Sequence, residues 1–128
     1  MKSLAVLAAL AVAASLAATP LVAAAAAEPI NLNARSSRDL AELCAANPKE
    51  AGADAKINFC HGFAQGAVDV YLQNAGSKKA FCFPSPAPRR TQTMNEFVAW
   101  VRALPDHQKL GATQGLFQFL GERFPCKG

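Results

Sequence analysis

The sequence lacks the short motifs that mark the common enzyme active sites. It contains no G-x-S-x-G nucleophile elbow, no H-E-x-x-H zinc helix and no phosphate-binding loop. Histidine, a frequent general acid or base, occurs only at His61 and His107. We therefore expect a protein that acts by binding, with no catalytic residue, no cofactor and no metal.

Close-spaced cysteine pairs and basic stripes are missing as well. The four cysteines are separated by 16, 22 and 44 residues, whereas structural zinc sites usually contain C-x2-C pairs. The 13 basic and 9 acidic side chains are scattered along the chain. Nucleic acid, which needs a basic stripe, is therefore not an expected partner.

The longest apolar run stands at the N-terminus. It extends from Leu4 to Ala27, follows a short positive start and ends in small residues ahead of Glu28. This order is typical of a secretory signal peptide, and we expect cleavage after about Ala27. A membrane anchor is the alternative, but alanine contributes little to insertion and Pro20 interrupts the run. No stable membrane insertion is expected after cleavage.

The run C-H-G-F-A-Q-G at 60–66 is the predicted centre of the fold. Apolar residues at three- and four-residue steps predict a helix over 55–74, with Asp54 as its N-terminal cap. Gly62 and Gly66 lie one turn apart on it. Interior glycine costs about 1 kcal/mol each, so we expect another segment to approach the backbone there. The sequence leaves open whether that segment belongs to the same chain or to a second copy.

Three further helices are predicted, and no segment alternates in the way typical of a strand. Capping boxes at Ser36–Asp39 and Thr93–Glu96 open two of them. Pro105-Asp106 is expected to form a turn, and residues 28–35 a flexible lead-in. The predicted helices cover 37–46, 55–74, 93–104 and 109–123. The domain at 36–128 is therefore expected to be all-α, with four helices.

The mature chain of 101 residues would carry all four cysteines and a net charge of +3. An even number of cysteines in an oxidising compartment favours disulfides, which strengthen a thin core. The cysteines Cys44, Cys60, Cys82 and Cys126 allow three pairings. Antiparallel packing of the first two helices brings Cys44 near Cys60, and Cys82 then holds the C-terminal segment through Cys126. This connectivity is a hypothesis.

The dipeptide Cys60-His61 has the composition of a cysteine–histidine nucleophile but the wrong geometry. Consecutive helical residues point about 100° apart, so the imidazole would not face the sulfur. A disulfide at Cys60 would exclude the nucleophile in any case.

The segment from Gly76 to Gln92 is irregular. Its prolines alternate, which forbids a helix and favours an extended path. The adjacent arginines either attract an acidic partner or are ordinary solvated surface. The residues of interest are Pro84, Pro86, Pro88, Arg89 and Arg90.

On the central helix, Asp69 is the one acidic residue of the apolar part, and we favour a structural role for it over a solvated position.

Four short motifs follow one another along the mature chain. They are L-x-x-L-C at 40–44, C-x-G-F-x-x-G at 60–66, C-x-P at 82–84 and L-x-x-x-F-P-C at 120–126. Their order and spacing resemble those of the Tai-type immunity proteins, which protect bacteria in the periplasm from type VI secreted amidase effectors. Gly62, Phe63 and Gly66 are the matching motif positions. The loop after Cys82 departs from the family pattern because it is rich in proline and a little long.

The resemblance implies an all-helical homodimer with two intramolecular disulfides. It also implies a protein partner, a papain-like amidase acting on peptidoglycan crosslinks, whose active-site cleft the immunity protein occludes. Under this interpretation the segment at 77–92 contacts the partner, while Gly62, Phe63, Gly66 and Asp69 serve helix packing.

Two other functions fit a small exported helical domain. The first is a periplasmic stress or acid chaperone, although only nine carboxylates are present to act as a switch. The second is an adaptor subunit of an envelope complex, which would bind non-enzymatic partners.

Overall fold

The computed structural model describes residues 20–21, 23–26 and 28–127, and the predicted signal peptide lies mostly outside them. Among the described residues there are five helices and no strand. They are α1 (Ser37–Cys44), α2 (Ala53–Asn74), α3 (Arg90–Ala103), α4 (Pro105–Lys109) and α5 (Ala112–Arg123). The predicted all-α class is confirmed. The predicted number of four helices is wrong, because Pro105 starts the short helix α4, where a missing N–H costs nothing.

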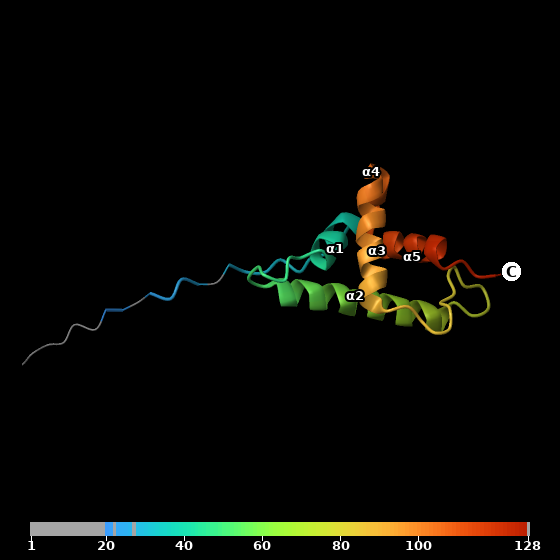
Figure 1. Ribbon diagram of the computed structural model, residues 1–128, viewed down its shortest axis with the longest axis horizontal. Helices are drawn as coiled ribbons and strands as arrows, with labels where there is room; N and C mark the ends of the chain where they lie inside the picture. The colour runs from blue at the N-terminus through green and yellow to red at the C-terminus, as the bar shows by residue number, and fades with distance from the viewer. Residues whose placement is uncertain (1–19, 22, 27, 128) are drawn as a thin grey trace, which may run out of the picture.

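The helices are arranged around α1, which contacts each of the other four. In Figure 1 the long helix α2 forms the base, α3 stands across it, and α4 continues beyond the end of α3. The lead-in to α1 and the C-terminus lie at opposite ends of the molecule. No helix in the described part of the chain is long and apolar enough to cross a membrane.

One of the two predicted capping boxes is present. The hydroxyl of Ser36 accepts a hydrogen bond from the Asp39 N–H at 3.1 Å, and the Asp39 carboxylate accepts one from the Ser36 N–H at 2.9 Å. These two bonds satisfy free N–H groups at the start of α1.

The other two predicted N-terminal caps, Asp54 and Thr93, are wrong. The cap of α2 is Gly52, at a left-handed φ of 78°, and Asp54 lies inside the first turn, where its charge still favours the helix dipole. Helix α3 begins three residues before Thr93. The buried hydroxyl of Thr93 donates to the carbonyl of Arg89 at 3.2 Å, so it stabilises the first turn from within.

The core lies where α1, α3 and α5 meet above α2. Its most completely buried large side chains are Phe81, Phe97, Leu40, Leu116, Leu120 and Val101. The tightest approach is between α1 and α5, where the fully buried Ser37 faces Gly115. A Cβ added at Gly115 would overlap Oγ of Ser37 and lie 2.9 Å from its Cβ. Only glycine fits at this crossing.

Two polar contacts connect α3 to α5 at the surface. The Arg123 guanidinium donates to Glu96 at 2.6 Å, and the Trp100 indole N–H donates to Glu122 at 2.6 Å. The bond from Arg123 lowers the pKa of Glu96, and the bond from Trp100 lowers the pKa of Glu122. The Ser36 backbone N–H likewise lowers the pKa of Asp39 in the α1 cap.

These three lowered pKa values predict acid destabilisation. The folded state keeps the carboxylates ionised at a lower pH than the unfolded state, so their contribution is complete above the unfolded pKa of about 4 and is lost as the pH falls through the folded values. We expect the melting temperature, followed by circular dichroism, to drop below about pH 4, and to drop less in Glu96→Gln and Asp39→Asn.

The matched control is Glu50→Gln, which changes an exposed carboxylate in the turn before α2. It should leave the pH profile of the melting temperature unchanged. An Asp39→Asn profile that is parallel to the wild type would contradict the assignment.

Candidate interaction site

The irregular segment between α2 and α3 is anchored at its first half. Gly76 turns the chain after α2 with a left-handed φ of 58°. The Ala80 N–H then donates to the Tyr71 hydroxyl at 2.6 Å. Phe81 is fully buried, with its ring 4.9 Å from that of Tyr71. The Cys82 N–H donates to the Phe124 carbonyl at 2.8 Å, so the segment enters its proline-rich half from a fixed point.

The disulfides have the predicted connectivity. Cys44 pairs with Cys60, joining α1 to the middle of α2, and Cys82 pairs with Cys126, joining the irregular segment to the chain after α5. By loop-closure entropy the two bonds stabilise the fold by about 3 and about 4 kcal/mol. Because Cys60 is bonded, it is not a nucleophile beside His61.

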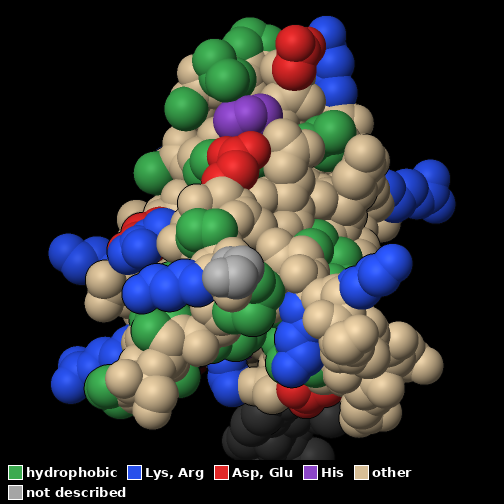
Figure 2. Space-filling model, turned by 90° about the vertical axis from the view of Figure 1, so that its right-hand side faces the viewer, with side chains coloured by type: hydrophobic (Ala, Val, Ile, Leu, Met, Phe, Trp, Pro, Cys, Tyr) green, Lys and Arg blue, Asp and Glu red, His purple; other side chains and the backbone are tan. Residues whose placement is uncertain are grey.

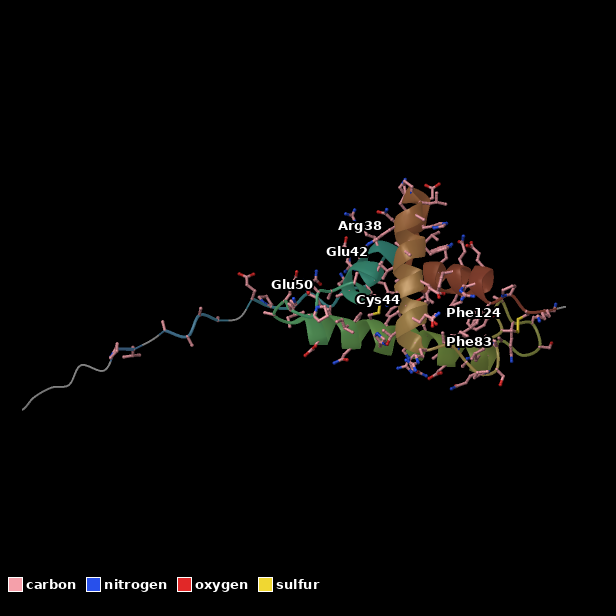
Figure 3. All side chains as sticks on the ribbon, in the orientation of Figure 1. Arg38, Glu42, Cys44, Glu50, Phe83 and Phe124 are labelled. Atoms are coloured by element: carbon pink, nitrogen blue, oxygen red, sulfur yellow. A yellow bond between two sulfur atoms is a disulfide. The ribbon has the colours of Figure 1, made fainter. Side chains whose placement is uncertain are left out.

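The second half of the segment projects its prolines outward. We call residues 82–89 the proline segment. Pro84 and Pro86 are exposed and Pro88 is half-buried, while the peptide bond between Ser85 and Pro86 is cis. Phe83 and Phe124, labelled in Figure 3, lie at its base with ring centroids 5.4 Å apart. Phe83 still exposes 38% of its surface.

A polar chain connects the end of this segment to α2. Arg90 donates to the side-chain carbonyl of Gln65, and the Gln65 amide donates to both Asp69 oxygens at 3.1 and 2.9 Å. Asp69 is therefore exposed and bound to an amide, and it contacts Arg90 only through Gln65. Arg89 lies just before α3, and its carbonyl accepts from Thr93.

Between α2, the proline segment and α3 there is a cavity of about 380 Å³, which we call the loop groove. Its floor reaches the core at Ala64, Met94, Leu116 and Leu120. Its walls and rim are Gln65, Val68, Asp69, Leu72, Phe83, Ala87, Pro88, Arg90 and Thr93. The groove is thus apolar at its base and carries charged groups only at its rim.

A second hollow lies on another face of α2. This glycine face is lined by Gly62, Phe63, Gly66, Ala67, Val70, Tyr71, Asn74, Ala75, Thr113 and Phe117. None of these residues is charged, and Val70 is 63% exposed. A Cβ added at Gly62 or Gly66 would meet nothing within 4 Å. In the described part of the chain, therefore, no other segment packs closely against these two glycines, and the second of the two alternatives, contact with another copy, stays a prediction.

Positive charge is concentrated around the proline segment. Between Asp54 and Glu96 the only acidic residue is Asp69. Five basic residues lie in this segment, in the stretches directly before and after it, or beside its disulfide. They are Lys78, Lys79, Arg89, Arg90 and Lys127. Figure 2 views the molecule from this end, and most of the charged side chains on that face are those of lysine and arginine.

The histidines and other potential metal ligands are dispersed in the described part of the chain. Among the described residues no three His, Cys, Asp or Glu side chains are close enough to hold a metal. His107 lies in α4, where its ring stacks on Trp100 with the centroids 3.6 Å apart and its Nδ1 lies 2.7 Å from the Trp100 carbonyl oxygen. This histidine therefore has a packing role.

Sequence reasoning found the proline segment but missed the loop groove. The groove residues of α2, at 65, 68, 69 and 72, follow helical spacing, so the sequence did indicate that they share one face of the helix. Phe83 and Met94 come from other segments, and no local pattern connects them to that face.

The fold and these surfaces define a class, a small disulfide-bonded helical domain equipped for binding other proteins. The family model of the Rap1a immunity proteins matches residues 36–126. The chain belongs to this family, whose members are immunity proteins of type VI secretion. The class predicted from the four motifs is thereby confirmed, and the narrower assignment to the Tai type stays a prediction. No curated protein and no solved structure matches the chain.

We expect an added methyl group at Gly115 and at Gly62 to change the free energy of unfolding in opposite directions. Gly115→Ala should lower the free energy of unfolding by about 1–3 kcal/mol, because the buried Ser37 cannot move away. Gly62→Ala, in open space on α2, should raise it by about 0.5–1 kcal/mol through better helix propensity. Denaturant unfolding in dilute solution measures both, and the double variant Ser37→Ala with Gly115→Ala should recover part of the loss. A loss in Gly62→Ala as large as that in Gly115→Ala would contradict the open face.

Proposed function

We propose that this protein is a periplasmic immunity protein that binds a peptidoglycan amidase effector of type VI secretion and occludes its active site. The observation that carries the proposal is the proline segment, which leaves the body of the molecule between two anchored ends. The disulfide and Phe81 hold one end, and the start of α3 holds the other. Such a segment loses little entropy when it enters a cleft.

The family membership supports the class of this function, and the sequence supports the compartment. Residues 1–27 act as a signal peptide that is cleaved after about Ala27, and the exported domain then forms its disulfides. The protein inhibits by binding and contributes no catalytic group. Its partner is a papain-like cysteine amidase that cleaves peptidoglycan crosslinks.

Loosening the proline segment tests this function. We expect replacement of residues 84–88 by a glycine–serine stretch to raise the inhibition constant at least about tenfold, because the flexible segment must be ordered on binding. The measurement uses the amidase captured from secreted and periplasmic fractions by the tagged protein, with digestion of purified peptidoglycan as the readout.

The matched control replaces residues 47–50, an exposed turn at the other end of the domain, by the same type of stretch. That variant should inhibit as the wild type does. Equal inhibition by both variants would remove the proline segment from the mechanism. Capture of many weak partners on acidification would instead favour the chaperone, and a single non-enzymatic envelope protein the adaptor.

We further propose that the glycine face is the surface of the homodimer. The supporting observations are the missing charges, the exposed Val70 and the two glycines without an intramolecular contact. Two such faces related by a twofold axis can approach closely, since neither carries a side chain at Gly62 or Gly66.

A pair of aspartate substitutions on α2 tests the dimer surface. Val70→Asp should raise the dimer Kd at least about tenfold, because it buries a charge in an uncharged contact. Leu72→Asp, two residues along on the loop-groove side, should leave it unchanged. Analytical ultracentrifugation measures both, and a Val70→Asp protein that dimerises as the wild type does would exclude this surface.

A further inference from the structure

We propose that the loop groove binds a large apolar side chain that an acidic segment of the effector presents. This proposal rests on the proposed function only for the source of the segment. It assigns the groove a role separate from that of the proline segment beside it, which enters the cleft. The groove holds the effector at a second point, outside the active site.

The shape of the groove fits one inserted apolar side chain. Its floor is formed by the buried core residues Met94, Leu116 and Leu120, and its cavity of about 380 Å³ is open to solvent. Leu72 and Phe83 stand at its walls with 36% and 38% of their surfaces exposed. Filling the groove would remove the exposed apolar surface of these walls from water, which is favourable.

The charge at the rim selects the segment that carries this side chain. Asp69 already accepts two hydrogen bonds from Gln65, and no other acidic residue lies between Asp54 and Glu96. Arg90 stands at the rim itself, and four more basic residues belong to the neighbouring stretches, at positions 78, 79, 89 and 127. An acidic segment is attracted to the net positive charge of this part of the molecule, whereas a basic one is repelled.

The same charges argue against a second copy of this chain as the occupant. A twofold contact through the loop groove would bring the positively charged stretches of two copies towards each other, and like charges across an interface are unfavourable. The glycine face, which has no charge, carries no such penalty.

The test uses defined peptides and the oxidised protein, and it needs no effector. A blocked pentapeptide EEFEE is titrated against the isotope-labelled protein by NMR, beside KKFKK and EEGEE. The expected result is weak binding of EEFEE alone, with the largest signal changes at Val68, Leu72, Phe83 and Leu116. Leu72→Asp should weaken this binding at least about tenfold, and Val70→Asp, on the other face of the same helix, should not.

A second variant keeps the test valid if Leu72→Asp does not fold, as judged by circular dichroism. Lys78→Glu with Lys79→Glu changes exposed side chains only and should weaken EEFEE binding about fivefold. Equal binding of KKFKK, signal changes centred elsewhere, or no effect of any groove variant would overturn the proposal.

Inhibition of the purified amidase separates this proposal from the proposed function. If the protein does not inhibit an amidase but still binds EEFEE in the groove, the proposed function fails and the groove assignment stands. If wild type and Leu72→Asp inhibit equally well, the function stands and the groove is overturned.

Discussion

The burial of Phe81 is the contact on which both candidate surfaces depend. Its ring packs against Tyr71 of α2 and Phe117 of α5, which line the glycine face, and against Phe83, which lines the loop groove. Phe81 is completely buried although it lies in a segment without regular structure. One buried aromatic side chain thus packs against lining residues of both hollows, and the neighbouring disulfide holds the chain beside it.

The two disulfides stabilise different parts of the domain. Cys44–Cys60 lies within the helical body, where α1 already packs on α2, so it reinforces a contact that the core also supports. Cys82–Cys126 joins two stretches that have no helix of their own, and the burial of Phe81 and Phe124 and the backbone bond from Cys82 to Phe124 assist it. The second bond is therefore the one that the proline segment requires, and the first serves the fold as a whole.

The helical fold could be predicted because its signals are local. Apolar spacing located α2 and α5, and the Ser36 capping box located the start of α1. The start of α3 could not be predicted in this way, because Arg89 supplies only its backbone carbonyl as a cap and Thr93 is buried inside the helix. The short helix α4 was missed because Pro105, which ends one helix, also begins the next.

The candidate surfaces were predictable only where one segment makes them. The alternating prolines marked their segment directly, and Gly62 and Gly66 marked a face but not what covers it. The loop groove needs α2, α3, α5 and the proline segment together, so its shape follows from tertiary packing. The net positive charge near the groove, in contrast, follows from the sequence, since Asp69 is the single acidic residue between Asp54 and Glu96.

The placement of both hollows on α2 has a consequence for stoichiometry. Val70 and Leu72 are two residues apart, and successive helical residues rotate by about 100°, so the two side chains point in nearly opposite directions. A protein bound on one side of α2 therefore leaves the other side open. A pair of copies joined through their glycine faces would carry two free grooves, and could hold two partner molecules without either one excluding the other.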